Sequence, residues 1–257
     1  MKILLQRCAA ATAVAIMMTP AHGAPCTARS AATLVPLVEL YTSEGCSSCP
    51  PADRWLNESF AGASNAATAL AFHVDYWDDG GWKDRFSSPA YTARQYQVAN
   101  ANDATFVYTP HVVVQGRSTT DWRGLATHLA ELESAQAAAA ITVAVTAEGD
   151  ELSIDAAADV GASSRRKGAK LYVALASNGL TTQVRGGENR GATLRHDHVV
   201  RTLTDGAPVD AAGHATVTTK MRAAPDGNPS TVIAFVQDPA RGDVLQTLAL
   251  PLARCRR

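Results

Sequence analysis

The sequence has no block of basic residues, and it has no apolar run long enough to cross a membrane. Its 23 lysine and arginine residues nearly balance 24 acidic residues, which leaves a formal net charge of -1. A chain without a basic patch is a poor partner for nucleic acid or for an anionic membrane surface. The sequence therefore predicts a protein with no stable membrane span. Its 257 residues are enough for one or two packed domains.

Cysteine is also scarce, and its spacing argues against a zinc site. The chain holds five cysteines and a single C-x-x-C pair, formed by Cys46 and Cys49. A structural zinc ion usually needs a second cysteine pair, or two histidines at ligand spacing. His196 and His198 are only two residues apart, and they lie in the other half of the chain. We therefore expect no bound metal, and the thiol chemistry of such a pair needs no organic cofactor.

Residues 1–23 are typical of a secretory signal peptide. A basic start is followed by a short apolar stretch, and Ala21 and Gly23 supply the small side chains that precede a cleavage point. Cleavage after Gly23 would remove Cys8, two basic residues and no acidic residue, so the formal charge would go from -1 to -3. The expected location is periplasmic or secreted.

The four cysteines that follow this segment are expected to form pairs, because an oxidising compartment favours disulfides. Cys46 and Cys49 have the spacing of a redox pair, which leaves Cys26 and Cys255 near the two ends of the mature chain. We expect Cys26 and Cys255 to form a structural disulfide, worth about 4–5 kcal/mol in the chain-entropy model. The alternative is two unpaired cysteines on frayed ends.

The Cys46–Cys49 pair lies between an expected strand and an expected helix. Residues 34–41 are apolar and indicate a buried strand, and two prolines directly after Cys49 begin a helix that runs to about residue 60. Cys46 would then lie at the helix N-terminus, where unpaired N–H groups and the helix dipole stabilise an anion. Its thiol is therefore expected to ionise more easily than that of a free cysteine.

The first half of the chain continues to alternate between strand and helix. A second apolar strand is expected over residues 68–77, which makes a βαβ unit with parallel strands. A helix is expected from Pro89. Within residues 106–116, Pro110 opens a β-branched run that indicates a strand, because proline is tolerated at the start or edge of a strand, and Gly116 would turn the chain. A long alanine-rich helix that ends near Ala140 is expected next.

Asp75 and Trp77 stand at the end of the second expected strand. The carboxyl ends of parallel strands meet at one edge of a sheet, where ligands bind. We therefore expect His73 or Asp75 near Cys46 as a charge that tunes its thiol, and Trp77 and Trp82 as an apolar wall for a peptide. The alternative is that these residues only fix the long loop that follows.

From Ile141 the pattern changes to short β-rich segments separated by turn residues, which indicates an antiparallel β-sandwich. The predicted domains are residues 24–140 and 141–257, although the alanine-rich stretch before residue 140 is also compatible with a flexible linker. A glycine-rich stretch over residues 186–191 lacks the strand-to-helix setting of a phosphate loop. It is expected to pack against the redox face.

The first half resembles the thioredoxin-like fold. Pro50, directly after the second cysteine, fits that fold, and Thr109-Pro110 resembles its cis-proline at the start of a later strand. The resemblance implies that Thr109 and Pro110 shape a groove for a substrate peptide. It also implies that Glu39, an acid inside an apolar strand, is buried and moves a proton to and from the second cysteine. The alternative is a Glu39 side chain that points outward.

The chain also resembles a secreted family known as domain of unknown function 1223. The similar segments span nearly the whole mature chain and comprise residues 38–53, 72–78, 81–84, 94–95, 107–110, 187–191 and 198–201. The resemblance implies a thioredoxin-like domain, and it implies no particular substrate.

Together these features predict an α/β thioredoxin-like N-terminal domain with an inserted loop and helix, followed by an antiparallel β-sandwich domain. The expected function is exported thiol–disulfide oxidoreduction by Cys46 and Cys49, with protein or peptide thiols and disulfides and a redox partner protein as partners. Two alternatives remain open. One is a non-catalytic binding module with a structural Cys46–Cys49 disulfide, and the other is a carrier of copper or another soft metal.

Overall fold

The structure, a computed structural model, describes residues 24–62, 67–161, 167–223 and 227–255. The expected signal peptide lies outside the described residues. No helix within them is long and apolar enough to cross a membrane.

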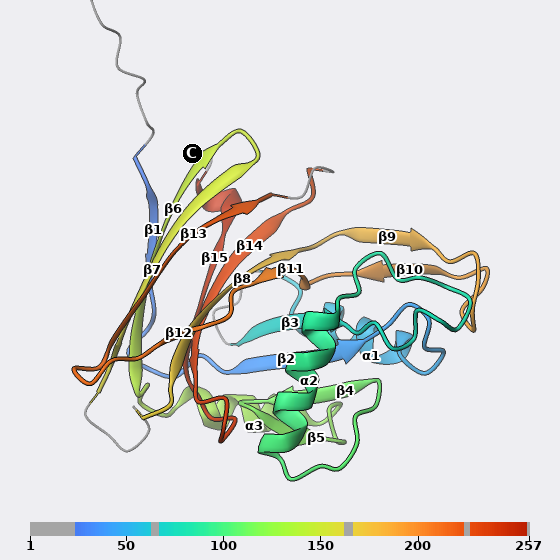
Figure 1. Cartoon of the computed structure of the whole chain (residues 1–257), viewed down its shortest axis with the longest axis horizontal. Coiled ribbons are helices and arrows are strands. Elements are labelled where there is room, and N and C mark those ends of the chain that lie inside the picture. The colour runs from blue at the N-terminus through green and yellow to red at the C-terminus, as the bar shows by residue number, and fades with distance from the viewer. Residues whose placement is uncertain (1–23, 63–66, 162–166, 224–226, 256–257) are drawn as a thin grey trace, which may run out of the picture.

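A large mixed β-sheet runs through both halves of the chain (Figure 1). Its strands are β2 Leu37–Thr42, β3 Thr68–His73, β4 His111–Val114, β5 Arg117–Thr119, β8 Lys170–Ser177, β11 Val199–Leu203, β12 Ala207–Pro208, β14 Ser230–Gln237 and β15 Val244–Pro251. They lie in the order β15-β14-β8-β11-β3-β2-β4-β5, and β12 pairs with β8. The halves join at β3, because it pairs in parallel with β2 on one side and with β11 on the other.

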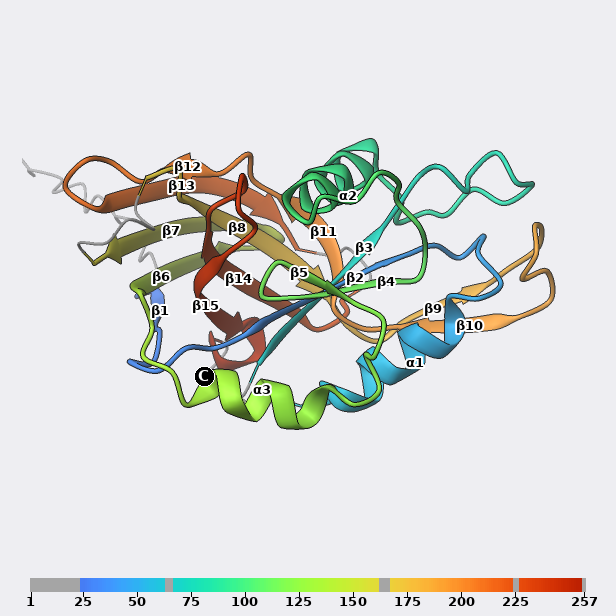
Figure 2. The same cartoon turned by 90° about the horizontal axis from the view of Figure 1, so that it is seen from below.

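Three helices cover the part of the sheet that contains β2 to β5. They are α1 Pro50–Ser59, α2 Pro89–Ala101 and α3 Leu125–Glu133. Helices α1 and α3 lie on one face of the sheet and α2 lies on the other (Figure 2). The alternation of side chains along β2 explains both contacts. Val38 and Leu40 pack with α1 and α3, whereas Leu37 and Tyr41 pack with α2.

A second, antiparallel sheet faces the β15-β14-β8 side of the large sheet (Figure 1). In sheet order it contains β1 Cys26–Arg29, β6 Ala139–Glu148, β7 Glu151–Val160 and β13 His214–Arg222. Burial alternates along β7, so every second side chain faces the large sheet. Fully buried Ile141, Ile154 and Leu171 belong to the core between the two layers.

The two ends of the described chain are tied together beside this core. The short 3-10 helix η1 Leu252–Cys255 follows β15, and Cys255 forms a disulfide with Cys26 of β1. The Cys26–Cys255 pairing is the one that the sequence predicts.

A two-stranded ribbon extends from the large sheet past the start of α1 (Figures 1 and 2). It consists of β9 Leu180–Gln183 and β10 Thr193–His196, which pair antiparallel and are joined by residues 184–192. We call residues 180–196 the arm. Because the arm belongs to the second half of the chain and reaches α1 of the first half, it brings distant sequence segments to one place.

Two sequence-based expectations about local structure are wrong. The helix expected to reach Ala140 ends at Glu133, and Ala139 and Ala140 belong to β6. Alanine favours helices, but here pairing with β7 and burial of alternate side chains decide the conformation. A flexible linker at this place is wrong for the same reason. The strand that the sequence predicts directly after Pro110 is confirmed, because β4 begins at His111.

The predicted division into domains at residue 140 stays a prediction. Residue 140 lies within β6, and β6 pairs with β1 from the start of the chain. The large sheet also passes without interruption from β2 and β3 to β11, β8 and β14. The sheet that contains β2 is therefore built from strands of both halves.

Candidate functional site

Cys46 and Cys49 form a disulfide in the turn between β2 and α1, with an S–S distance of 2.13 Å. Cys49 is the N-cap of α1, and Pro50 is the first residue of the helix. Both cysteines are fully buried, whereas Ser47 and Ser48 between them are exposed. The structure thus places the pair at the strand-to-helix turn that the sequence predicts. We call residues 44–49 the redox turn.

The start of α1 offers few free N–H groups. Its first two residues are prolines, which have no N–H. The next two N–H groups donate to the carbonyl oxygen of Cys49. The Ser48 hydroxyl oxygen lies 3.3 Å from the Cys46 sulfur, so it is in place to donate to a thiolate. Free N–H groups at the start of α1 therefore stabilise a Cys46 thiolate less than the N–H groups of an ordinary helix N-terminus would.

Glu39 is buried in β2 and forms an ion pair with Arg94 of α2. Its Oε1 accepts a hydrogen bond from Arg94 Nε at 2.7 Å, and a second guanidinium nitrogen lies 2.6 Å from the same oxygen. The guanidinium also lies over three aromatic rings, those of Phe72, Tyr172 and Phe235. The outward-pointing alternative for Glu39 is wrong. Alternation along β2 places Glu39 on the α2 face, opposite the face that α1 covers.

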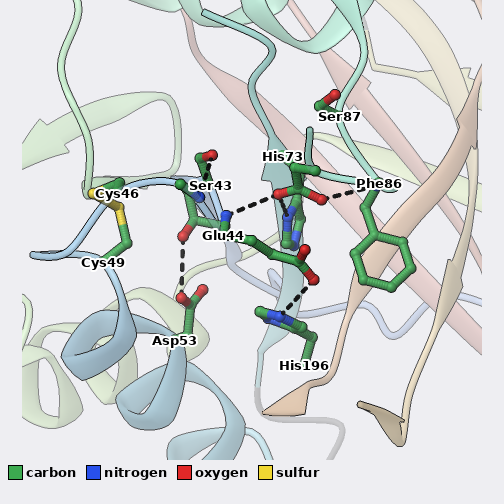
Figure 3. A network of polar contacts seen from close by, with 12 residues as sticks. Ser43, Glu44, Cys46, Cys49, Asp53, His73, Phe86, Ser87 and His196 are labelled. Carbon is green, nitrogen blue, oxygen red and sulfur yellow. Dashed lines mark hydrogen bonds and ion pairs between the residues drawn. A yellow bond between two sulfur atoms is a disulfide. The ribbon is translucent and has the colours of Figure 1, made fainter. Parts of the chain in front are cut away.

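A second buried carboxylate, Asp53, lies one helical turn after Cys49 (Figure 3). Its Oδ2 accepts from the Thr42 hydroxyl at 3.1 Å. Burial raises the pKa of the Asp53 carboxyl, and nearby His196 and His73 offset part of that rise. Sequence reasoning missed this residue. Its spacing was an available signal, because a side chain four residues after Cys49 lies on the same helix face.

Two histidines and two carboxylates are buried together next to the redox turn (Figure 3). Asp84 Oδ2 lies 2.6 Å from His73 Nδ1, and it also accepts from the Glu44 N–H at 2.9 Å. The Glu44 carboxylate lies 3.4 Å from His196 Nε2 and accepts from the Trp82 indole N–H at 2.8 Å. The two histidine rings meet edge to face, with centroids 5.0 Å apart. We call Glu44, His73, Asp84 and His196 the histidine cluster.

The contact between His73 and Asp84 sets the charge of both side chains. Burial alone would lower the pKa of His73, but the charge and the hydrogen bond of Asp84 raise it above its ordinary value. Burial alone would raise the pKa of Asp84, but His73 and two backbone N–H groups lower it to about 2. In mildly acidic solution a protonated His73 therefore faces an ionised Asp84.

Trp77 connects the redox turn to the Thr109-Pro110 segment. A Cβ added at Gly45 would lie 3.2 Å from the Trp77 Cβ, so the tryptophan packs directly against the residue before Cys46. The Trp77 indole N–H donates to the Thr109 hydroxyl at 2.8 Å. The Thr109–Pro110 peptide bond is cis. The structure thus brings three of the four expected substrate-binding residues into one connected region.

Asp75 has different partners. Its carboxylate accepts from the hydroxyl of Thr92 in α2, and its backbone N–H donates to the same hydroxyl. This contact joins the end of β3 to α2 and favours the alternative in which Asp75 fixes the loop.

The arm reaches the redox turn with two side chains. The Asn189 side-chain amide donates to the carbonyl oxygens of Glu44 and Cys46, each at 2.9 Å. The Glu188 carboxylate accepts from the Ser47 N–H at 3.0 Å. Sequence reasoning singled out this glycine-rich stretch but assigned no partner to its polar side chains.

The glycines of the arm allow this approach. A Cβ added at Gly186 would lie 2.2 Å from the carbonyl oxygen of Gly81, so only glycine fits there. At the base of the arm, Asn57 of α1 donates to the Arg195 carbonyl oxygen at 3.0 Å and accepts from the Asp197 N–H at 3.1 Å. The expected packing of the glycine-rich stretch against the redox face is confirmed.

Metal ligands are not grouped in the part of the chain that the structure describes. No set of three or more histidine, cysteine, aspartate or glutamate side chains there is placed to hold a metal ion. The groups that the arrangement brings together are a sulfur pair, a buried carboxylate and a histidine cluster.

Two solved structures are similar to this chain. One is the X-ray structure of a protein from Agrobacterium tumefaciens, with 27% sequence identity and a TM-score of 0.58, covering 85% of this chain and 94% of that one. The other is HBP35 of Porphyromonas gingivalis, with 15% identity and a TM-score of 0.64, covering 88% of this chain and 77% of that one. The second likeness concerns the fold alone. No curated protein matches the chain.

The sequence model of one protein family matches residues 37–237. This segment contains the redox turn, the Trp77–Thr109 contact and the arm. The match covers well over half of the 257 residues. The chain therefore belongs to the family described as "Protein of unknown function (DUF1223)".

Proposed function

We propose that the chain is an exported thiol–disulfide oxidoreductase that works through Cys46 and Cys49. The observation that carries the proposal is the disulfide at the start of α1 with the buried carboxyl group of Asp53 one turn further along the same helix. This arrangement combines an exchangeable sulfur pair with a group that can take up and release a proton. The second disulfide, Cys26–Cys255, agrees with an oxidising periplasmic or extracellular location.

We infer that residues 37–133 form a thioredoxin-like unit. Its strand order β3-β2-β4-β5 supports this inference, with β2 and β3 parallel and β4 and β5 antiparallel to their neighbours. The placement of α1 and α3 on one face and α2 on the other also supports it. The two facing sheets of the second half agree with the proposed β-sandwich.

The proposed exchange moves two electrons between protein and substrate. When the disulfide oxidises a substrate, a substrate thiolate attacks the Cys46 sulfur, the Cys46–Cys49 bond breaks, and Cys49 leaves as a thiolate that takes a proton from Asp53. A second substrate thiolate then attacks the substrate sulfur of the mixed disulfide and releases Cys46 as a thiolate. In the reductive direction Asp53 accepts the proton of Cys49 as Cys49 attacks the mixed disulfide.

Exposed aromatic side chains favour a protein or peptide as substrate. Among the described residues, the exposed large apolar side chains are Tyr76, Tyr96, Phe106 and Tyr108. Gln95 ties two of them together, because it accepts from the Tyr76 hydroxyl at 3.2 Å and donates to the Tyr108 carbonyl oxygen at 2.8 Å. Tyr76 and Tyr108 directly adjoin Trp77 and Thr109 in sequence. Aromatic surfaces of this kind are common where proteins bind one another.

Two observations favour a second candidate, a non-catalytic binding module with a permanent disulfide. Both sulfur-bearing residues are fully buried, and the arm holds the redox turn with three hydrogen bonds. A structural disulfide typically has a reduction potential below about -300 mV, so a potential above that value in equilibrium with glutathione or dithiothreitol would exclude this candidate. Metal analysis of freshly reduced protein tests the remaining alternative, a soft-metal carrier.

The proposal is tested by the rate at which the protein exchanges with a disulfide-containing model protein. Cys46→Ala should abolish exchange, because it removes the sulfur that forms the mixed disulfide. The double variant Cys26→Ala/Cys255→Ala is the matched control, and it should retain exchange as long as it stays folded. Exchange by Cys46→Ala at the parent rate would exclude the proposed function.

A further inference from the structure

The arm supplies a carboxylate to the redox turn at the place where a thiolate would need stabilisation. Glu188 Oε2 accepts from the Ser47 N–H at 3.0 Å, and Ser47 directly follows Cys46. The two hydrogen bonds from Asn189 to the carbonyl oxygens of Glu44 and Cys46 hold the same turn. Three hydrogen bonds from the second half of the chain thus fix the turn.

The position of Glu188 is built into the fold. The close approach of Gly186 to Gly81 fixes the tip of the arm. Near its base, the guanidinium of Arg85 donates to the Thr181 carbonyl oxygen at 3.1 Å, and Asn57 contacts the segment that follows β10. Glu188 is therefore delivered to the redox turn by a supported loop, although its side chain is exposed.

Few N–H groups are free at the start of α1, and Glu188 occupies the N–H that follows Cys46. The two prolines at the start of α1 have no N–H, and the next two N–H groups bind the Cys49 carbonyl oxygen. The Ser47 N–H directly follows Cys46, and Glu188 accepts from it. The hydrogen bonds with Ser47 lower the pKa of Glu188, so the carboxylate is ionised at neutral pH. A negative charge then lies beside the position where the thiolate charge forms.

We propose that Glu188 is a positioning residue that binds the Ser47 N–H, holds a negative charge beside Cys46, and so makes the Cys46–Cys49 disulfide harder to reduce. The proposal deepens the proposed function, on which it rests, because it assigns a direction to the pair. The disulfide is a weak oxidant, and the reduced pair is a good electron donor. Two glutathione molecules reduce the disulfide to two thiols and become glutathione disulfide, so the balance of this reaction measures the effect.

Other charged groups also surround the redox turn, and they are the same in the parent protein and in a Glu188 variant. Asp53 comes from α1, and the histidine cluster contributes Glu44, His73, Asp84 and His196. All five are buried, so salt screens them much less than it screens exposed Glu188. The effect of Glu188 on the disulfide should therefore depend on salt concentration more strongly than the effects of the buried groups.

The test is the equilibrium between the full-length protein and glutathione buffers, measured for parent and Glu188→Gln. Glutamine keeps an oxygen that can accept from the Ser47 N–H but removes the charge. We expect the equilibrium constant to shift about three- to tenfold toward the reduced form at low salt, with a smaller shift at high salt. The pKa of the Cys46 thiol, measured from thiolate absorbance, should fall in the same variant. Glu188→Ala, which also frees the Ser47 N–H, should shift the equilibrium at least as far.

Glu58→Gln is the matched control, because it removes an exposed carboxylate from the far end of the same helix. It should leave the equilibrium unchanged. An equilibrium for Glu188→Gln equal to that of parent or of Glu58→Gln, or a shift toward the disulfide, would overturn the inference. A pair that responds to Glu188→Gln but never exchanges with a protein disulfide would reject the proposed function alone. A disulfide that no thiol reduces in the folded protein would reject both.

Discussion

The chain buries ionisable side chains on both faces of β2, and the two groups differ in the protons they can exchange. On the α2 face, Glu39 is paired with Arg94, and aromatic rings surround the guanidinium. On the α1 face, Asp53 lies near the histidine cluster, and both are close to the redox turn (Figure 3). An arginine stays protonated at any physiological pH, whereas a histidine changes its charge near neutral pH.

This difference indicates which of the two buried acids, Glu39 or Asp53, can take part in thiol chemistry. Glu39 is held by a permanent positive charge, so its ion pair contributes to packing and fold. Burial raises the pKa of Asp53, so this carboxyl group binds and releases protons closer to neutral pH than an exposed aspartate does. We therefore assign the proposed proton transfer to Asp53, while the role that the sequence analysis gave to Glu39 stays an untested prediction.

The largest effect is expected from breaking the α2-face pair. Arg94→Met leaves the buried Glu39 carboxylate without its partner, which should lower the free energy of unfolding by about 3–5 kcal/mol. Denaturant unfolding of the oxidised protein measures this loss. The exchange rate of the molecules that remain folded should be unchanged, because the pair lies on the face away from α1.

The double variant Glu39→Gln/Arg94→Met is the control for this experiment. It removes both charges and should recover part of the lost stability. An Arg94→Met protein of parent stability that exchanges disulfides slowly would reverse the assignment of the two faces.

A smaller effect, a slower exchange without loss of stability, is expected from Asp53→Asn. Asparagine is similar in shape but cannot take up the proton of Cys49, so thiol–disulfide exchange should slow by about 100-fold. Stability should stay the same or increase, because the variant removes a buried carboxylate whose charged form burial disfavours. Stopped-flow exchange kinetics compare it with Glu58→Gln on the same helix, which should react at the parent rate. An equally fast Asp53→Asn variant would remove Asp53 from the mechanism.

The smallest expected effect is a pH-dependent contribution of His73 and Asp84 to stability. The raised pKa of His73 stabilises the fold at pH values below its ordinary pKa of about 6.5, and this contribution is lost as pH rises through the folded value. Asp84, with its pKa lowered to about 2, stabilises the fold above its ordinary pKa, and this contribution is lost as pH falls toward 2. The pair should therefore contribute most between about pH 4 and 6.5, by roughly 2 kcal/mol.

Unfolding free energies of parent and His73→Gln at pH 3, 5 and 9 measure this contribution. The difference between the two proteins should be greatest at pH 5. A difference that does not change with pH would show that the histidine acts only by filling space. The α2-face pair offers the contrast, because the Arg94 charge should give no such optimum near neutral pH.

Local features of the site could be predicted from the sequence because they depend on neighbouring residues. The apolar run before Cys46 and the prolines after Cys49 were enough to place the pair between a strand and a helix. The end of the second expected strand and the Thr109-Pro110 motif also identified Trp77 and Thr109 as candidate substrate-binding residues, and the two side chains are in contact.

The rest depends on contacts between segments far apart in sequence. Glu188 meets Ser47 across 141 positions, and no local pattern indicates where a glycine-rich hairpin will lie. The alanines at 139 and 140 favour a helix locally, and only the neighbouring strand β7 makes them part of a sheet. Glu39 looked like the functional acid because nothing in its own strand reveals Arg94, which is 55 positions away.

The measurement that tests the central claim most directly is trapping of a mixed disulfide with the Cys49→Ser variant. If the pair turns over, this variant should form a disulfide-linked adduct with a protein partner through Cys46, and a thiol reductant should release it. The double variant Cys46→Ser/Cys49→Ser is the control and should form none. A Cys49→Ser protein without any adduct, or with the same adducts as the double variant, would contradict a redox role for the Cys46–Cys49 pair.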